Sequence, residues 1–443
     1  MLLERKRFVS FDGGITENAE FLRPDRYRMV EASLGKKYRI VRGGGYSYAA
    51  ASFGGGSIVQ DFTLFNRVLE FDSQSGLIKV EAGISLSDLL SVTVPRGFWL
   101  PVIPGYPAIT VGGCVAANVH GKNPSQRGTF RNYVEELTLF HPAYGVRSIS
   151  ELKDPLVFHL TCGGYGLTGA IISATLRLER LPGSKTLVKR ISVGSFNEGL
   201  EVISEVGRQN DFAYSMHQAY PDRKIIGRGY VSTGGMVPDE SATWQTNAQV
   251  KMINASGRGR IPFSVFGGLR TRLILTVHWL TERAKPTTVT EPLYDSLFPF
   301  VGKEHYFTLY GKRGLVECQV IVPYKESEQF LNELQRLLLK EQVPAVMGSI
   351  KLFKGEPRLL RFEMDGVCVA LDLVRCEKTM RFLSAMDQLT ISTGGIPFVI
   401  KDSRLPAKTI NSCYPEYELM KEYLLNYDPD RLFRSEMSQR LGL

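Results

Sequence analysis

Three glycine-rich segments before residue 170 have the composition of phosphate-binding loops. They read RGGGYS at 42–47, PGYPAITVGG at 104–113 and GGYGLTG at 163–169. Because glycine lacks a Cβ, its backbone N–H groups can approach an anion closely and its φ can be positive. None of the segments continues into the Gly-Lys-Ser/Thr of a P-loop. They therefore predict a cradle for a phosphate-bearing ligand of another kind.

The third segment contains the pattern G-x-G-x-x-G at 164–169, which also occurs in Rossmann dinucleotide sites. In those sites the pattern opens a helix, and an acidic residue follows about twenty positions later. Here the residues at 170–179 alternate and are rich in β-branched types, which predicts a strand. The context therefore argues against a Rossmann site.

Two polar side chains interrupt segments that predict strands. Gln319 lies within ECQVIVP, and Lys351 begins KLF. A polar group inside an apolar strand costs about 1–3 kcal/mol unless it has a partner, so such positions point to a functional site. Since side chains alternate along a strand, each could instead face solvent.

Lys401 and His120 have the chemistry of catalytic groups. Lys401 lies in FVIKD, which predicts a strand with the lysine on a buried or half-buried face, and the alternative is a surface lysine. His120 ends a strand-like segment before GKN, and the alternative is a structural histidine at a turn. A histidine serves proton transfer near neutral pH, and an ammonium stabilises negative charge that develops beside it.

The elements that must position these groups change in character near residue 183. Before it, short β-branched segments alternate with glycine turns, and Ser85 with Asp88 predicts a capped helix. After the breaker cluster LPGS at 181–184, longer elements follow. The expected helices are 196–210, 325–341, 377–390 and 415–426, and the expected strands are 315–323, 346–353 and 367–374.

These elements predict an α+β fold with a large antiparallel sheet covered by helices in its second part. We expect a first domain at 1–182 that carries the glycine loops and a second domain at 183–395. The remaining residues, 396–443, are expected to return to the first domain.

Charge and composition narrow the partners. The chain has 54 basic and 45 acidic residues, a net charge of +9, which favours anionic partners. Its densest basic runs, 5–7 and 258–260, are too short for a polybasic arm, so we expect no nucleic-acid binding. With 43% apolar and 22% charged residues, the chain reads as an ordinary globular protein.

The cysteines and apolar runs indicate the compartment. No pair of the six cysteines has the spacing of a zinc knuckle or a redox motif, which predicts a reducing compartment and no metal. The first residues lack the apolar core of a signal peptide, and no run approaches the ~18 apolar residues that cross a bilayer. We therefore expect a cytoplasmic protein whose contact with the inner face of the membrane is peripheral.

Taken in order, the three glycine segments resemble the two-part FAD-binding domain (PCMH type) of the vanillyl-alcohol-oxidase flavoprotein superfamily. The resemblance implies that the first two loops wrap the pyrophosphate of FAD and that the strand after the third lies beside the adenine and ribose. The FAD contacts it implies are Arg42, Gly43, Gly44, Gly45, Tyr46, Ser47, Gly105, Thr110, Val111, Gly112, Gly113, Ala117, Asn118, His120, Ile171, Phe398 and Lys401. Many relatives with a covalent flavin carry a histidine where this chain has Tyr46, so the resemblance implies FAD bound non-covalently.

A narrower resemblance adds TVGGC continuing to NVHGKN at 118–123, KDSR at 401–404, and the final segment at 428–433. Together they are similar to the family of decaprenylphosphoryl-β-D-ribose 2′-oxidases, the flavin half of a two-enzyme epimerase that makes an arabinofuranose donor for glycan biosynthesis. This implies oxidation at C2 of a polyprenyl-phosphate pentose, with Lys401 and His120 as catalytic residues, and a short-chain reductase that acts on the keto product.

The same resemblance places Gln319, Lys351, Cys368 and Ala370 at the substrate. Ala370 occupies a position where well-known members have a cysteine, and Phe398 replaces an aromatic residue that carries a hydroxyl, so the pocket is altered. The alternative enzyme is a soluble-sugar, alditol or aldonolactone oxidase that uses oxygen. Outside the enzymes, the alternatives are a binding protein with a vestigial flavin site and a basic nucleic-acid binder.

A lipid-linked substrate would require docking at a membrane, and residues 251–285 are the expected surface. The apolar residues there lie in IPFSVF at 261–266 and LIL at 273–275, and only Glu282 is acidic. The basic residues are Lys251, Arg258, Arg260, Arg270, Arg272, Arg283 and Lys285. The alternative is an ordinary loop whose apolar residues belong to the core.

Overall fold

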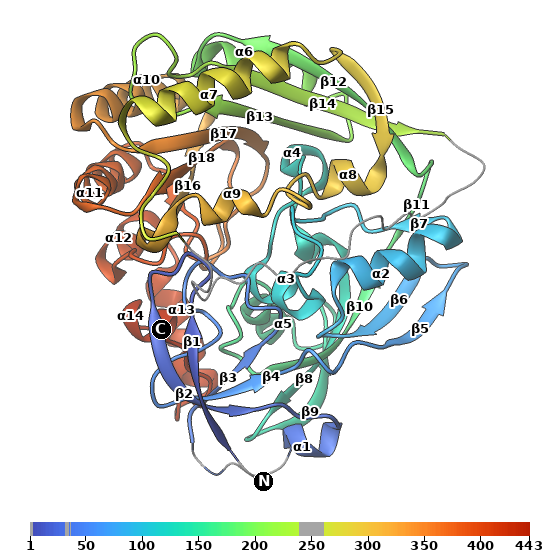
Figure 1. The fold of residues 1–443 in the computed structure, drawn as a ribbon. Coiled ribbons are helices and arrows are strands. Elements are labelled where there is room, and N and C mark those ends of the chain that lie inside the picture. The colour runs from blue at the N-terminus through green and yellow to red at the C-terminus, as the bar shows by residue number, and fades with distance from the viewer. Residues whose placement is uncertain (1–2, 32–34, 36, 239–260) are drawn as a thin grey trace.

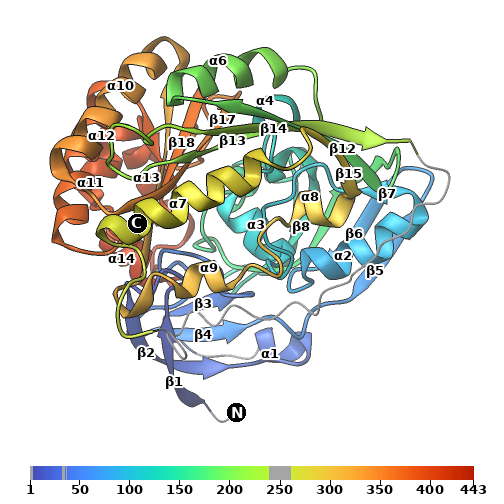
Figure 2. The same cartoon turned by 45° about the horizontal axis from the view of Figure 1, so that its top comes forward.

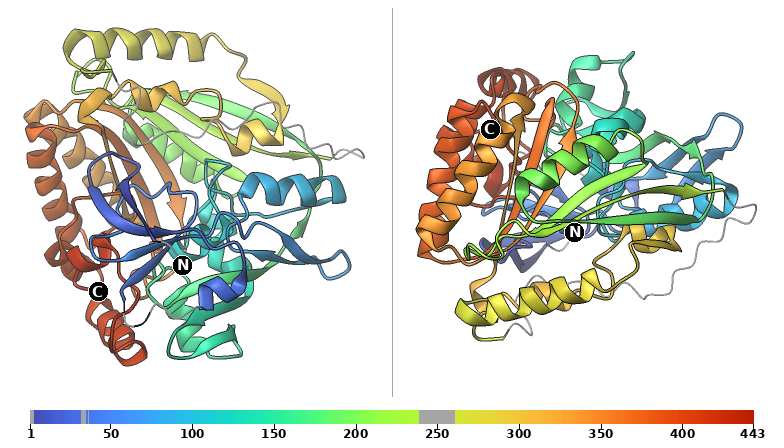
Figure 3. Two further views of the ribbon diagram at one scale, coloured as in Figure 1. Left: turned by 60° about the horizontal axis from the view of Figure 1, so that its bottom comes forward. Right: turned by 90° about the horizontal axis from the view of Figure 1, so that it is seen from above.

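The computed structural model describes residues 3–31, 35, 37–238 and 261–443. It is an α+β structure in which the first 180 residues form small sheets and the following residues form one large sheet (Figure 1). The N-terminal strands and the C-terminal helices lie beside one another although they are farthest apart in the sequence (Figure 3, left). None of the helices within the described residues is long and apolar enough to cross a bilayer.

The first part contains two sheets that flank the glycine loops. In one, β1 and β2 are antiparallel while β2, β4 and β3 run parallel, and in the other all neighbours are antiparallel. The four-stranded sheet has the order β1 (Glu4–Val9), β2 (Thr16–Leu22), β4 (Ile58–Asp61), β3 (Arg39–Arg42). The five-stranded sheet has the order β5 (Val68–Asp72), β6 (Leu77–Glu81), β10 (Ala170–Arg177), β8 (Val134–His141), β9 (Gly145–Ile149).

Short helices connect these strands and cover the five-stranded sheet. They are α1 (Tyr27–Glu31), α2 (Leu86–Thr93), α3 (Val111–Ala117), α4 (Pro124–Arg127), α5 (Pro155–Thr161) and the 3-10 turns η1 (Val94–Arg96) and η2 (Phe130–Tyr133). A two-stranded ribbon of β7 (Phe98–Trp99) and β11 (Glu179–Arg180) closes this part. The Ser85 cap is confirmed, since its side chain accepts from the N–H of Asp88 at the start of α2.

The second part is an eight-stranded sheet in which all neighbouring strands are antiparallel. Its order is β15 (Thr288–Pro292), β12 (Lys185–Val193), β14 (Gly229–Val237), β13 (Phe212–Gln218), β17 (Ala345–Phe353), β18 (Gly366–Val374), β16 (Leu315–Pro323), β19 (Ile396–Pro397). The predicted strands at 315–323, 346–353 and 367–374 are confirmed to within a residue.

Helices cover one face of this sheet and bury a core against it. They are α6 (Phe196–Val206), α10 (Tyr324–Glu341) and α11 (Glu377–Ser392), as predicted for 196–210, 325–341 and 377–390. The apolar face of α10, which includes Phe330 and Leu334, is buried in that core. The other helical elements of this part do not belong to that layer. They are α7 (Gly268–Arg283), α8 (Leu293–Leu297), α9 (His305–Thr308) and the 3-10 turn η3 (Gly311–Arg313). The long helix α7 lies on the side of the sheet opposite α6 (Figure 3, right).

The C-terminal residues return to the first sheet. Three helices follow β19, namely α12 (Ala407–Cys413), α13 (Tyr417–Tyr427) and α14 (Glu436–Arg440). The N–H of Arg39 in β3 donates to the carbonyl of Leu432 at 2.8 Å, and the N–H of Arg434 donates back to the carbonyl of Arg39 at 2.9 Å. The domain limits at 182 and 395 remain predictions.

Two local predictions are wrong. Residues 398–402 form a turn, in which the N–H of Lys401 donates to the carbonyl of Phe398 at 3.0 Å. Phe398, Val399 and Ile400 are nevertheless buried, so the apolar run reflected burial and not a strand. His120 does not end a strand, because it follows α3, whose last turn closes at Asn118 in the left-handed conformation.

Candidate active site

The first two glycine loops meet in the structure. A Cβ added to Gly43 would lie 2.1 Å from the Thr110 hydroxyl, and one added to Gly44 would lie 2.6 Å from the carbonyl of Ala108. Gly45 has φ +78°, which a residue with a side chain rarely adopts. Only glycine lets the two loops pack this closely, so segments about 65 residues apart form one cradle with their backbones.

The Thr110 hydroxyl also begins α3, since it accepts from the N–H of Gly113 at 3.3 Å. On the other side of this helix, a Cβ on Gly112 would lie 2.9 Å from the Cβ of Ala82. The glycines after Thr110 therefore let the start of α3 lie between the first loop and the five-stranded sheet. Gly105, in the same loop, faces the ammonium of Lys122.

The side chains around the cradle fit a dinucleotide. Arg42 is half-buried, donates to the Ser52 hydroxyl at 2.8 Å, and has its pKa lowered by burial of the guanidinium. Gln60 of β4 is fully buried, and neither atom of its amide has a partner among the described residues. A buried amide without a partner costs about 1–3 kcal/mol, so a ligand with polar edges would stabilise this position. These residues and the glycine cradle together fit FAD.

Other residues predicted at the cofactor lie around this cradle. Burial raises the pKa of Tyr46 to about 12, so its phenol stays neutral, and its ring packs 4.9 Å from that of Tyr106. The Ser47 hydroxyl donates to the carbonyl of Ala49. The side chain of Asn118 is engaged by Glu363 and by the N–H of Arg131, and its backbone N–H closes the last turn of α3. Ile171 of β10 and Val111 of α3 belong to the same buried core, between the five-stranded sheet and this helix.

The eight-stranded sheet presents the predicted substrate residues on one face. In its register Gln319 is opposite Ala370, which is opposite Ser349, and Lys351 is opposite Cys368. Because residues two apart share a face, Gln319, Ala370, Cys368 and Lys351 all lie on the same side. That side faces away from α10 and α11, and Gln319 on this side contacts His120.

Lys401, Glu317, Gln319 and His120 form a continuous polar chain. The ammonium of Lys401 lies 3.1 Å from Oε2 of Glu317 and 4.1 Å above the ring of Tyr48. The amide of Gln319 donates to the other oxygen of Glu317, and its carbonyl oxygen lies 3.4 Å from Nε2 of His120. Thus the structure brings both predicted catalytic residues and one predicted substrate residue together around a buried carboxylate.

The surroundings of His120 determine its protonation. Its Nδ1 lies 3.0 Å from the carbonyl of Gly121 and its Nε2 lies 3.4 Å from the carbonyl oxygen of Gln319, and both oxygens can only accept. A neutral imidazole has a single N–H, which the shorter contact places on Nδ1. Nε2 then keeps its lone pair, and it can donate to Gln319 only after the ring takes up a second proton. Burial, with the charges of Lys351 and Lys401, lowers its pKa to about 3. The rings of Phe353, Phe362 and Phe398 surround it. His120 is therefore a neutral proton acceptor above pH ~4.

Asp372 stands directly opposite Glu317 on the neighbouring strand. Burial, and then the charge of Glu317, raise its pKa to about 7. The Tyr306 hydroxyl donates to it at 2.7 Å and lies 2.6 Å from that of Tyr310. A second negative charge opposite Glu317 is unfavourable, so Asp372 keeps its proton up to about pH 7, while Glu317 pairs with Lys401.

Lysines and a thiol complete this face. Lys351 is half-buried, and its pKa is lowered by burial. Lys122 lies 5.7 Å from the ring of Tyr214, and burial together with the charge of Lys351 lowers its pKa to about 7. Burial raises the pKa of the Cys368 thiol to about 12, so this thiol is not a nucleophile.

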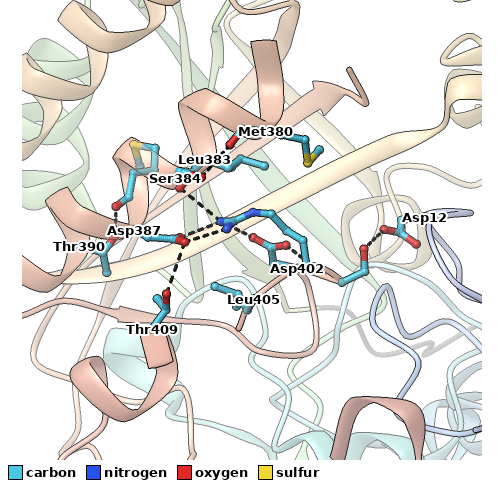
Figure 4. A network of polar contacts seen from close by, with 12 residues as sticks. Asp12, Met380, Leu383, Ser384, Asp387, Thr390, Asp402, Leu405 and Thr409 are labelled. Atoms are coloured by element: carbon cyan, nitrogen blue, oxygen red, sulfur yellow. Dashed lines mark hydrogen bonds and ion pairs between the residues drawn. The ribbon is translucent and has the colours of Figure 1, made fainter. Parts of the chain in front are cut away.

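The turn that carries Lys401 is fixed on both sides (Figure 4). Asp387 of α11 accepts from both Nη1 and Nη2 of Arg404 at 2.7 Å, and Asp402 lies 2.9 Å from the same guanidinium. The Ser403 hydroxyl donates to Asp12 near the N-terminus. The sequence KDSR is therefore explained as one catalytic candidate followed by three residues that anchor its turn.

We expect Arg404→Ala to lower the free energy of unfolding by about 3–5 kcal/mol, because it leaves two buried carboxylates without their cation. Chemical denaturation of the FAD-bound protein measures this loss. The control is Arg336→Ala, which removes an exposed i,i+3 pair with Glu333 and should change stability by less than about 1 kcal/mol. Equal effects of the two substitutions would contradict the anchoring role.

Sequence reasoning assigned no role to Glu317, Asp372 or the tyrosines near them. Glu317 is two residues before Gln319, and that spacing within an apolar strand was a detectable signal. The position of Asp372 opposite it depends on pairing between strands about 55 residues apart, for which the sequence offers no signal.

Comparisons with known proteins define the class. The family model described as FAD binding domain matches residues 32–146, which include both glycine loops of the cradle. The chain therefore contains the FAD-binding domain predicted from these loops, and FAD is its cofactor.

The chain is similar along most of its length to a protein named decaprenylphosphoryl-beta-D-ribose oxidase, from Mycolicibacterium smegmatis. The identity is 27% over 422 residues, 93% of this chain and 91% of that protein. An uncharacterized protein of Streptomyces coelicolor is 26% identical over 81% of this chain and its own full length. L-gulono-1,4-lactone dehydrogenase of Mycobacterium tuberculosis is 23% identical over 93% of this chain and 91% of its own length.

We expect FAD to be bound without a covalent bond, because a phenol stands at Tyr46, where a linking imidazole would be required. Acid denaturation should release the yellow colour into the supernatant. A control with a flavoprotein of known histidyl linkage should keep its colour in the pellet. Flavin fluorescence that migrates with this polypeptide on a denaturing gel would contradict the expectation.

Proposed function

We propose that the chain is an FAD-dependent oxidoreductase that converts a secondary alcohol of a sugar to a ketone, with C2 of a polyprenyl-phosphate pentose as its substrate position. The observation that carries the proposal is the buried chain from Lys401 to His120, which ends in an imidazole lone pair. The similarity to a protein named as a decaprenylphosphoryl-ribose oxidase, over nearly the whole of both chains, supports the substrate class.

Each residue has a role that follows from its contacts. FAD, when bound, supplies the hydride acceptor. Nε2 of His120 accepts the proton of the hydroxyl that is oxidised. The ammonium of Lys401 stabilises negative charge that develops next to it, and Glu317 holds that ammonium in place. Gln319 donates to Glu317, and its carbonyl oxygen can accept from Nε2 once His120 has taken up the proton, which stabilises the protonated ring.

Lys122 and Lys351 suit the phosphate of such a substrate. Each lies in a largely buried environment, and the charge of Lys351 lowers the pKa of Lys122. An anion between them would relieve this repulsion and raise both pKa values. A neutral lactone offers no such charge, which favours a phosphorylated sugar over the aldonolactone alternative.

A keto product at C2 needs a second hydride transfer to complete an epimerisation. The reductant would come from a separate short-chain reductase, acting on the opposite face of the sugar. The pair would then supply an arabinose donor for glycan biosynthesis from a ribose precursor.

A substrate panel tests the proposal. The purified holoenzyme is incubated with polyprenyl-phosphoryl ribose in detergent micelles, with free ribose, or with L-gulono-1,4-lactone, each with an artificial electron acceptor. We expect turnover with the first alone and a ketone at C2 that is trapped by hydroxylamine. Turnover with the lactone and none with the lipid-linked sugar would replace the proposal with the aldonolactone oxidase, which the similarity to the mycobacterial lactone dehydrogenase makes the second candidate.

A further inference from the structure

The long helix α7 exposes an apolar stripe. Leu269, Leu273, Val277 and Leu280 are 80%, 66%, 51% and 54% exposed. Their spacing of four, four and three residues places them along one side of the helix. From Leu269 to Leu280 this stripe is about 17 Å long, which is unusual for a surface that faces water.

The side of α7 that faces the protein is largely polar. The amide of Gln218 donates to the carbonyl of Leu275 at 2.6 Å, and Arg272 pairs with Asp222 at 3.1 Å. Trp279 lies between the guanidinium groups of Arg228 and Arg283 at 5.2 and 5.0 Å. The helix is therefore attached mainly by polar contacts, with Leu275 as its one fully buried apolar residue, while the exposed apolar stripe faces outward, unlike in α10.

The exposed charged residues around the stripe are basic. Arg270, Arg283 and Lys285 are exposed, and Glu282, the single acidic residue between 261 and 290, is paired with Lys285. The surface predicted at 251–285 is thereby narrowed to the outer side of α7. Phe266 and Leu275 belong to a buried core, and Lys251, Arg258 and Arg260 lie outside the described residues.

We propose that the outer side of α7 docks on an anionic lipid bilayer. Apolar side chains would insert at the level of the headgroups while the flanking arginines bind lipid phosphates, as in interfacial amphipathic helices. This inference rests on the proposed function, since a polyprenyl-phosphate substrate lies in a bilayer. A second copy of the chain is a poorer partner, because a twofold contact would bring the basic residues together.

The position of α7 relative to the site agrees with this occupant. The helix lies over β13 and β14 on the face of the sheet that carries the site (Figure 2). On that face the Tyr230 hydroxyl lies 3.5 Å from the sulfur of Met216, and Met216 is opposite Ser349, which is opposite Ala370. One face of the sheet thus runs from under α7 to the predicted substrate residues, with aromatic and thioether side chains that suit a polyprenyl chain.

Vesicle sedimentation tests the docking, with the FAD-bound protein detected by its absorbance. The vesicles contain phosphatidylcholine with or without phosphatidylglycerol. One variant combines Leu273→Ser and Val277→Ser, and another combines Arg270→Ser and Arg283→Ser. The matched control combines Leu152→Ser and Lys153→Ser, two exposed residues before α5.

We expect the wild type and the control to bind anionic vesicles equally at low salt. The arginine variant should bind roughly tenfold more weakly at low salt and differ little at high salt, because lipid headgroup attraction is screened. The apolar variant should bind at least about tenfold more weakly at both salt concentrations. Flavin content and melting temperature should match the wild type in every variant, since the substituted side chains are exposed.

Three results would overturn the docking: no binding of the wild type to anionic vesicles, equal binding of the α7 variants and the control, or a dimer that the apolar variant converts to a monomer without any vesicle binding.

Failure of the proposed function is a separate result. Docking stands, and the function falls, if vesicles bind but the lipid-linked sugar in detergent micelles is not oxidised. The function stands, and docking falls, if the sugar is oxidised but vesicles do not bind.

Discussion

Lys401→Ala should slow reduction of the flavin by substrate about 10²–10³-fold, because it removes the one charged stabiliser placed in the buried polar chain. Stopped-flow absorbance under anaerobic conditions measures the rate of this half-reaction directly. The bound flavin should still be reduced by dithionite at the normal rate, since that reaction needs no substrate.

A structural explanation must be separated from the chemical one, because the substitution leaves the carboxylate of Glu317 buried without its cation. The double variant Lys401→Ala with Glu317→Gln removes both charges and should recover the stability but not the rate. Lys401→Arg, which retains a cation, should be intermediate in rate. If either single or double variant turns over almost normally, Lys401 only balances the charge of Glu317.

His120→Ala should slow the same half-reaction about 10²–10⁴-fold, the usual span for a general base. His120→Gln restores a hydrogen-bond acceptor without a basic nitrogen and should recover little of the rate. A histidine with an ordinary pKa would add an inflection near neutral pH. Because the pKa of His120 is lowered to about 3, the residue stays neutral above pH ~4 and adds no such inflection.

An inflection near pH 7 in the rate of flavin reduction should instead come from Asp372, whose pKa is raised to about 7. Below that pH the carboxyl is protonated, and above it a second negative charge faces Glu317 and opposes charge development beside Lys401. Burial also lowers the pKa of Lys122 to about 7, but at saturating substrate the phosphate keeps that lysine charged. Under this condition the rate should fall as pH rises through 7, and Asp372→Asn should abolish that fall. A profile in Asp372→Asn that is unchanged, or an inflection near 7 that His120→Ala removes, would contradict this assignment.

The sequence predicted three strands of the large sheet, β16, β17 and β18, and the three helices that cover it, because their patterns are local. The strand at 315–323 is a run of apolar and β-branched residues, and α10 has an apolar stripe of helical period. The glycine loops were equally readable, because their backbone requirement appears directly as glycine.

Where the prediction failed, tertiary contacts decided the local structure. Residues 398–402 look like a strand since Phe398 to Ile400 are apolar, but Pro397 cannot donate to a ladder and the chain turns immediately after it. Helix α7 was not predicted because its apolar side faces outward, so its pattern does not indicate which side meets the core. The ion pair between Glu317 and Lys401 could not be predicted, because it depends on the pairing of β16 with β19 and on the turn that follows β19.

Flavin reduction by a substrate deuterated at C2 of the pentose tests the central claim most directly. The holoenzyme is mixed anaerobically with polyprenyl-phosphoryl ribose that carries either hydrogen or deuterium at that carbon, and the loss of flavin absorbance is followed. The account predicts rapid bleaching that is slowed severalfold by deuterium at C2 and is unaffected by deuterium at C3. Bleaching with no isotope effect at C2, or no bleaching by the lipid-linked sugar while L-gulono-1,4-lactone bleaches the flavin, would contradict it.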